Sequence, residues 1–171
     1  MRPSTAEHPT VFISEYSTPW GTLLLADLDG RITLCDWVTS ARFEGHLRTL
    51  SPNRCYADTP LITEAKRQLD EYARNIRRDF NIPLTDAPTP FAAKVREIIL
   101  TVPFGQTISY QQLAQLSGNP RAVRAVARAV ACNPLSLLVP CHRIIGSDGS
   151  LTGYAGGLPA KQSLLLHEKR R

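Results

Sequence analysis

The first third of the chain carries the pattern of hydrophobic and polar residues that is typical of β-strands. β-Branched, aromatic and other apolar residues dominate 10–16, 22–27 and 31–38, and the turn sequences Thr18-Pro19-Trp20-Gly21 and Asp29-Gly30 separate these segments. Asp-Gly is a preferred dipeptide of tight hairpins. The pattern therefore predicts three consecutive antiparallel strands.

The hydrophobic period changes to that of α-helices after residue 58. Thr59 and Thr89 are each followed by a proline, and a threonine cap with proline at the first helical position is a common helix start. Apolar residues then recur every three to four positions, which predicts helices that end near Asn75 and at Val102. The segment 80–84 looks extended, and we expect the proline-rich segment after it to separate domains of residues 1–86 and 87–171.

Two shorter helices are predicted next. Ser109 and Gln112 have the spacing of a capping box, which places one helix over 109–116. Ser117-Gly118-Asn119-Pro120 forms a turn into a second helix over 120–131. Helix, short glycine-containing turn and helix together make a helix-turn-helix pattern.

The last elements complete an α/β (α+β) protein. The apolar run 135–139 predicts a buried strand, and 159–169 predicts a final helix. We expect a small N-terminal antiparallel sheet with a helix and a mainly helical C-terminal domain with a helix-turn-helix.

Charge is distributed unevenly along the 171 residues. The chain has a formal net charge of +5, and residues 101–171 contain 8 basic and 2 acidic side chains, a net +6. An anionic partner is therefore expected on the second half. No apolar run approaches the ~20 residues that a membrane span requires, and the first 20 residues do not resemble a signal peptide. We expect a cytoplasmic monomer that has no contact with membranes.

The second helix of the pair has an arginine face. Arg121, Arg124 and Arg128 project from one side at about 100° per residue, and valines occupy the other side. Small residues such as Ala125 would let the backbone approach a partner closely. No acidic residue stands at i+4 to neutralise the arginines. The pattern favours a nucleic-acid contact, and a merely solvated arginine face is the alternative.

Cysteine and histidine stand side by side at Cys141 and His142, directly after the apolar run. A thiolate is the reactive form of cysteine, and a neighbouring imidazole can take the thiol proton. A histidine needs an orienting partner, for which Glu168 is the best acidic candidate of this half. A buried cysteine that acts only as a small hydrophobe is the alternative.

Two further positions are candidates for this site. Tyr154 lies among three glycines in 152–157, where it could stack on a flat ligand or simply sit in a flexible turn. Asn133 could cap the preceding helix or hydrogen-bond into the site. The spacing of the cysteines gives no zinc motif, so the chemistry predicts no metal, and the remaining cysteines are read as structural: Cys35, Cys55 and Cys132.

Four segments together resemble the O6-alkylguanine-DNA alkyltransferase family, in the family's order and spacing. They are Ser-Tyr-Gln-Gln-Leu-Ala at 109–114, Gly-Asn-Pro-Arg-Ala-Val-Arg-Ala-Val at 118–126, Pro-Cys-His-Arg-Ile-Ile at 140–145 and Gly-Tyr-Ala-Gly-Gly at 153–157. The resemblance covers about residues 80–171, and residues 10–80 are similar to the family only in layout. It implies a ribonuclease H-like layout for the N-terminal α/β domain and a winged-helix-like helix-turn-helix in the C-terminal domain.

The resemblance implies roles for the residues that carry out the reaction. It implies that Cys141 accepts the alkyl group, that His142 deprotonates this cysteine through a water, and that Glu168 holds the histidine. It places Asn133 in the same hydrogen-bond network. The reaction would be irreversible, so each molecule would act once and would need no cofactor.

The resemblance also implies how the target base leaves the duplex. Arg124 matches the residue that takes the place of the extruded base, and Tyr110 the tyrosine that crowds the target's phosphate. We expect Arg121 and Arg128 to bind phosphates, one turn to either side, and Ala125 to allow close approach. The partner is then double-stranded DNA that contains O6-alkylguanine.

A guanine pocket is the last implied feature. Ala155 stands where some members have serine, so a side-chain hydrogen bond from this position to the substrate oxygen is absent here. The residues that match the pocket are Tyr154, Ala155, Gly156, Ile144 and Val130. Whether O4-alkylthymine is also a substrate stays open. The alternatives are a helix-turn-helix or lesion-binding protein that transfers nothing, and a Cys-His hydrolase.

Overall fold

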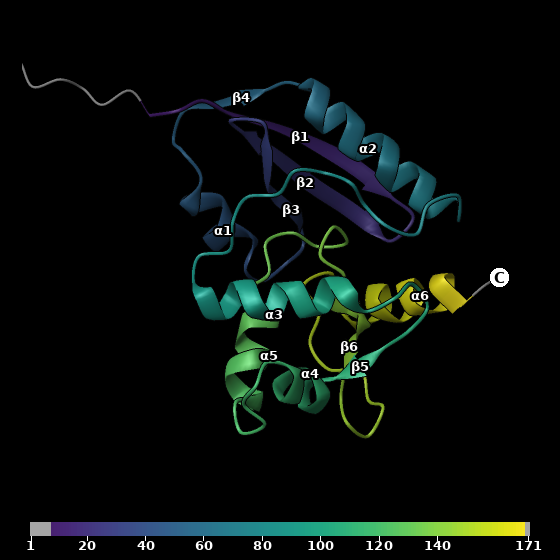
Figure 1. The fold of residues 1–171 in the computed structure, drawn as a ribbon. Helices are drawn as coiled ribbons and strands as arrows, with labels where there is room; N and C mark the ends of the chain where they lie inside the picture. Colours follow the sequence, from purple (N-terminus) through teal and green to yellow (C-terminus); the bar gives the residue numbers. More distant parts are fainter. Residues whose placement is uncertain (1–7, 170–171) are drawn as a thin grey trace, which may run out of the picture.

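The computed structural model describes residues 8–169, and its first half is built on a four-stranded sheet (Figure 1). The strands are β1 (Val11–Thr18), β2 (Gly21–Leu28), β3 (Arg31–Trp37) and β4 (Arg54–Tyr56), in the order β3-β2-β1-β4. β1 to β3 pair antiparallel, which confirms the predicted meander. β4 was not predicted, and it pairs parallel with β1, so the sheet is not purely antiparallel.

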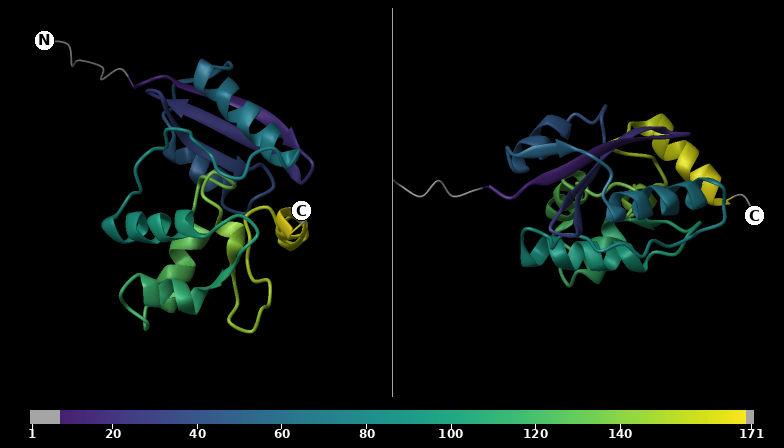
Figure 2. Two further views of the ribbon diagram at one scale, coloured as in Figure 1. Left: turned by 45° about the vertical axis from the view of Figure 1, so that its right-hand side comes forward. Right: turned by 90° about the horizontal axis from the view of Figure 1, so that it is seen from above.

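Two helices accompany the sheet. α2 (Pro60–Ala73) crosses one face of the sheet and contacts β1, β2 and β3 (Figures 1 and 2). The hydroxyl of Thr59 accepts a 3.1 Å hydrogen bond from the backbone N–H of Ile62, which confirms the predicted cap. α1 (Phe43–Thr49) was not predicted, because it buries no residue fully and has no side-chain cap that would reveal it.

The second half consists mainly of helices: α3 (Pro90–Thr101), α4 (Tyr110–Leu116), α5 (Val123–Ala131) and α6 (Leu158–Lys169). The capping box of Ser109 and Gln112 forms as predicted. Two short parallel strands, β5 (Ile108–Ser109) and β6 (Ile144–Ile145), were not predicted, because two residues carry no readable alternation. The mixed α/β class is thus confirmed.

Two sequence predictions of this half are wrong. Leu135–Val139 is a buried loop instead of a strand: Leu137 has a positive φ of 67°, and the N–H of Val139 donates to the carbonyl of Leu135 at 2.8 Å. An apolar run shows burial without showing conformation. The second helix of the pair begins at Val123 instead of Pro120, because the side chain of Asn119 accepts from the N–H of Arg121 and forms a turn. Arg121 therefore precedes the helix.

The larger hydrophobic core joins the two halves. It includes Leu25 of β2 and Tyr72 of α2 together with Val95 of α3, Val130 of α5 and Cys141. A second cluster fills the opposite side of the sheet beneath α1. None of the helices between residues 8 and 169 is both long and apolar enough to cross a membrane.

Candidate active site and nucleic-acid interface

Cys141 begins a short 3₁₀ turn, Cys141–Arg143, directly after Pro140. The turn precedes β6, and its backbone is tied to the loop before it: the N–H of Cys141 donates to the carbonyl of Val139 at 2.7 Å. Cys141 is 5% exposed. The thiol therefore lies at the edge of the core and is almost completely covered.

The next two side chains of this turn meet the carboxylate of Glu168 on α6. The Nε2 of His142 lies 2.7 Å from Oε1 of Glu168. The guanidinium of Arg143 binds both carboxylate oxygens at 3.0 to 3.2 Å. Tyr72 donates its hydroxyl to Oε1 at 2.7 Å, and the backbone N–H of Gly105 donates to Oε2 at 2.9 Å. Every lone pair of this buried carboxylate is thus engaged, as a buried charge requires.

Gly105 is held close to α6 by this arrangement. Its φ is +79°, and a Cβ added there would lie 2.9 Å from the carbonyl oxygen of Glu168. Any other residue would push the segment before β5 away from the carboxylate. A glycine at this position therefore keeps the backbone N–H of residue 105 within hydrogen-bonding distance of Oε2 of Glu168.

Burial and partners set the titration of the pair formed by His142 and Glu168. Burial alone would raise the pKa of Glu168, but the hydrogen bonds from His142 and Arg143 and the positive charge of Arg143 outweigh it and hold this pKa well below its usual range. Burial lowers the pKa of His142, although Glu168 opposes the shift. At neutral pH the carboxylate is ionised and the imidazole is neutral. With Nε2 directed at Glu168, the Nδ1 atom of His142 has no hydrogen-bond partner among the described residues.

Burial also raises the pKa of the Cys141 thiol. Hydrogen bonding from Asn133 and the positive charge of Lys161 act in the opposite direction. Asn133 is itself fixed, since its Nδ2 donates to the carbonyl of Val139 at 3.2 Å and its Oδ1 accepts from the N–H of Leu135. The thiol is therefore mostly protonated at rest, and a base must take its proton before it can react as a thiolate.

Lys161 of α6 is a fully buried lysine that the sequence did not single out. Its ammonium donates to the carbonyls of Ile144 and Thr152 at 2.6 and 3.0 Å. Burial lowers its pKa to about 8. This one side chain ties α6 both to β6 and to the loop that contains Tyr154.

A cavity of about 600 Å³ lies in front of the thiol. Such a volume is within the range of small-molecule sites. Most of the lining residues belong to four segments: α5, the loop 146–155, the start of α4, and the loop between β3 and α1. The lining residues are Ser40, Ala41, Arg42, Tyr110, Gln111, Val123, Ala127, Val130, Ala131, Asn133, Cys141, Gly146, Ser147, Thr152, Gly153, Tyr154 and Ala155.

The structure brings most of the expected pocket residues together. Val130, Tyr154 and Ala155 line the cavity with Cys141. Ile144 lies deeper, fully buried, and offers its carbonyl to Lys161. Gly156 packs against the ring of Trp37.

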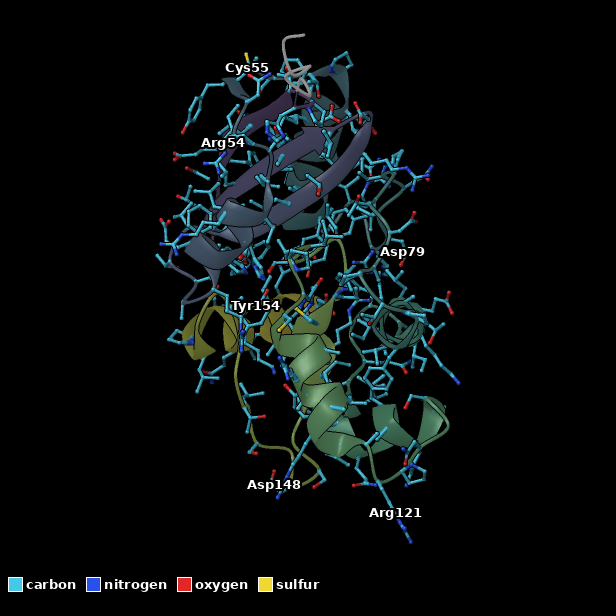
Figure 3. All side chains as sticks on the ribbon, turned by 90° about the vertical axis from the view of Figure 1, so that its left-hand side faces the viewer. Arg54, Cys55, Asp79, Arg121, Asp148 and Tyr154 are labelled. Atoms are coloured by element: carbon cyan, nitrogen blue, oxygen red, sulfur yellow. The ribbon has the colours of Figure 1, made fainter. Side chains whose placement is uncertain are left out.

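The basic side chains expected at the interface lie on the outside of α5 and the turn before it. Arg121, Arg124, Ala125 and Arg128 are exposed. None of these arginines forms an ion pair with any residue between 8 and 169. Figure 3 shows Arg121 at the end of the molecule opposite the N-terminal sheet. The cavity lies against Val123, Ala127, Val130 and Ala131 of α5, and Arg124, seven positions before Ala131, is exposed on an adjoining face of the same helix.

Several residues around the site were missed by the sequence reasoning. Tyr72 and Trp37 come from the N-terminal half, and they reach partners 96 and 117 positions away, so no local spacing could reveal them. The loop Ser40–Arg42 gave no signal either. Arg143 could have been found, because it follows the Cys-His pair directly.

Known proteins resemble this chain over nearly its whole length. A family model described as the DNA-binding domain of 6-O-methylguanine DNA methyltransferase matches residues 90–170. The constitutive methylated-DNA–protein-cysteine methyltransferase of Bacillus subtilis is 39% identical over 158 residues, which cover 90% of this chain and 92% of that protein. The chain belongs to the methylated-DNA–protein-cysteine methyltransferase family.

Solved structures of this methyltransferase family agree with the fold. The O6-methylguanine methyltransferase of Mycobacterium tuberculosis has a TM-score of 0.82 and 34% identity, with 94% of both chains covered. The same organism's protein in complex with DNA has a TM-score of 0.81 and 33% identity, with 92% of both chains covered. In the present chain, residues 8–169 contain no group of three His, Cys, Asp or Glu side chains that could hold a metal ion.

Proposed function

We propose that this protein repairs DNA by transferring the alkyl group of O6-alkylguanine irreversibly to its own Cys141. One observation carries the proposal: a nearly buried thiol faces a cavity of about 600 Å³, and the histidine beside it is fixed by a fully bonded carboxylate. A protein that only bound DNA would have no use for this arrangement. The family's methyltransferases, named for a cysteine acceptor, support it.

The proton of Cys141 leaves first. Because Glu168 faces the Nε2 of His142, the free Nδ1 is the basic atom, and a bridging water carries the thiol proton to it. The ionised carboxylate stabilises the imidazolium that results. Arg143 and Tyr72 keep the carboxylate ionised and in place, so they act as positioning residues.

The transfer itself is an in-line displacement. The Cys141 thiolate attacks the alkyl carbon, a sulfur–carbon bond forms, and the bond from this carbon to O6 breaks. The electron pair of the broken bond stays on guanine, which takes up a proton. In the overall reaction the thiol hydrogen is thus replaced by the alkyl group, and guanine gains one proton. A thioether does not release the alkyl group, and no metal or cofactor enters any step. Each molecule therefore acts once.

The reacting carbon is inaccessible inside a duplex, so the guanine must leave the base stack. We assign Arg124 to the space that the base vacates and Tyr110, which lines the cavity, to the neighbouring phosphate. Arg121 and Arg128 are assigned to flanking phosphates, and Ala125 allows α5 to approach the groove. The partner is thus double-stranded DNA that contains O6-alkylguanine.

We also propose a division of the fold. Residues 1–86 form an N-terminal domain with a ribonuclease H-like layout, and 87–171 form the DNA-binding and acceptor domain. The pair α4 and α5 with the short strands β5 and β6 supports a winged-helix-like arrangement of the second part.

Intact mass spectrometry after incubation with O6-methylguanine DNA tests the function. We expect one methyl group for each molecule, found on the peptide that contains Cys141. Cys141→Ala should accept nothing, whereas the matched control Cys132→Ala, at an exposed cysteine near the site, should react like the wild type. Duplex binding without a mass increase would instead indicate a non-catalytic lesion-binding protein. Repeated turnovers, or a label on another cysteine, would also contradict the proposal.

A further inference from the structure

The wall of the cavity that contains Tyr154 is a loop without regular secondary structure. Thr152, Gly153, Tyr154 and Ala155 line the cavity, yet the loop lies between β6 and α6 and pairs with no strand of the described chain. Lys161 holds its beginning. The position of the aromatic wall therefore depends on what holds Tyr154 itself.

Trp37, from the N-terminal half of the protein, contacts Tyr154. It is the last residue of β3, and it is 1% exposed. Its indole N–H donates to the hydroxyl oxygen of Tyr154 at 3.2 Å. The two rings meet edge to face, with their centroids 6.1 Å apart, a favourable geometry for aromatic pairs.

The same indole also touches the loop two residues further on. A Cβ added at Gly156 would lie 2.9 Å from both Cε2 and Nε1 of Trp37. Only a glycine lets the loop backbone come so close to the ring. Trp37 thus contacts the wall at Tyr154 and at Gly156.

Trp37 is rigidly held on the side away from the cavity. It pairs in register with Leu23 of the central strand β2. Its backbone N–H donates to Oδ1 of the buried Asp36 at 2.9 Å, and the other oxygen of Asp36 lies 2.8 Å from Nδ1 of His46. The indole is therefore part of the sheet's rigid framework, and it can fix a loop that has no framework of its own.

We infer that Trp37 is a positioning residue that sets the aromatic wall of the guanine pocket, an inference that rests on the proposed function. It gives the N-terminal sheet a direct part in recognition of the substrate base. Tyr154 also stands edge to face with His142 at 6.4 Å. The wall that Trp37 holds is therefore continuous with the group that activates the thiol.

Saturation kinetics with free O6-benzylguanine, followed by the mass of Cys141, test this inference. Trp37→Phe keeps an aromatic ring and removes the N–H donor. We expect the half-saturating concentration to rise about five- to tenfold, while the limiting rate of transfer stays within about twofold. Tyr56→Phe is the control, because Tyr56 is 79% exposed on β4 and does not line the cavity, and it should leave both constants unchanged.

Tyr154→Phe removes the same hydrogen bond from the other side and does not disturb the sheet. The double variant Trp37→Phe/Tyr154→Phe should bind O6-benzylguanine no more weakly than the weaker single variant, because both changes break one interaction. An unchanged half-saturating concentration in Trp37→Phe, or effects that multiply in the double variant, would overturn the inference. A wild type that takes no methyl group on Cys141 from O6-methylguanine DNA would instead contradict the proposed function.

Discussion

Arginine occupies two opposite environments in this protein. Arg143 is 3% exposed, binds both oxygens of Glu168 and donates to the carbonyl of Val102. Arg124 lies exposed on α5 and forms no ion pair within residues 8–169. The first guanidinium has its hydrogen bonds within the fold, and the second keeps its donors available for a partner.

Helix α2 shows that exposure alone does not leave an arginine without an ion pair. On α2, Arg67 pairs with Glu64 and Glu71, and Arg74, the C-cap residue directly after the helix, pairs with Asp70. Exposed pairs of this kind contribute only about 0–1 kcal/mol each, but they neutralise the surface. The comparison teaches that the positive charge of α5 is left uncompensated on one surface, where a polyanion can bind.

Removal of the buried charge should have the largest effect. In Glu168→Gln, Arg143 loses its counter-charge and the imidazolium of His142 loses its stabilising partner. We expect methyl transfer to Cys141 to slow by about 10²–10⁴-fold and the free energy of unfolding to fall by about 3–5 kcal/mol. Mass spectrometry of samples quenched at successive times measures the transfer rate, and chemical denaturation measures the free energy of unfolding. Asp148→Asn, at an exposed turn, is the control, and a wild-type rate in Glu168→Gln would exclude the orienting role.

Removal of the exposed Arg124 side chain should have the second largest effect. Unstacking a base costs a few kcal/mol, so Arg124→Ala should slow repair of duplex DNA by about one to three orders of magnitude. Reaction with free O6-benzylguanine requires no extrusion and should stay near the wild-type rate. Arg74→Ala, at the C-cap of α2, should change neither reaction. Equal losses on both substrates would mean that Arg124 supports the pocket or the fold.

The pH dependence should separate the two environments further. Because burial lowers the pKa of His142, the neutral base persists below pH 6.5, and the transfer rate should fall only as the pH drops through this lowered pKa. Glu168 raises the pKa of His142, so Glu168→Gln should move the acidic inflection to still lower pH. Arg124→Ala should leave the inflection with O6-benzylguanine unchanged. Rates measured from pH 5 to 8 test both shifts, and an inflection above 6.5 would contradict the assignment.

The smallest effects are expected at the flanking arginines. Removal of one phosphate contact lowers the slope of log affinity against log salt by about one unit. Arg121→Ala and Arg128→Ala should each show this change in DNA titrations at several salt concentrations. Arg67→Ala, whose guanidinium is already paired, should not. A slope that stays at its wild-type value in both variants would remove these residues from the interface.

Much of the fold could be predicted because local signals were strong. The antiparallel meander followed from alternation and turn residues, and three helix starts followed from the caps at Thr59, Thr89 and Ser109. Leu135–Val139 was misjudged, because a buried loop and a buried strand have the same composition. α1 and β4 bury too little to produce a pattern.

The candidate site divides in the same way. Cys141, His142 and Glu168 carry their chemistry in the sequence, and the structure brings them together. Tyr72 and Trp37 look like ordinary core residues in the sequence, because their polar partners belong to the other half of the chain. A role that depends on a contact across two halves has no local signature.

The ratio of transfer rates on duplex O6-methylguanine DNA and on free O6-benzylguanine, measured side by side in Glu168→Gln and Arg124→Ala, tests the account most directly. In the proposed mechanism the buried network acts on the thiol, so Glu168→Gln should slow both reactions and leave the ratio within about threefold of the wild type. The proposal assigns the exposed Arg124 to the duplex, so Arg124→Ala should lower the ratio by about tenfold or more. A ratio that falls in Glu168→Gln, or stays constant in Arg124→Ala, would contradict the division between chemistry and DNA recognition.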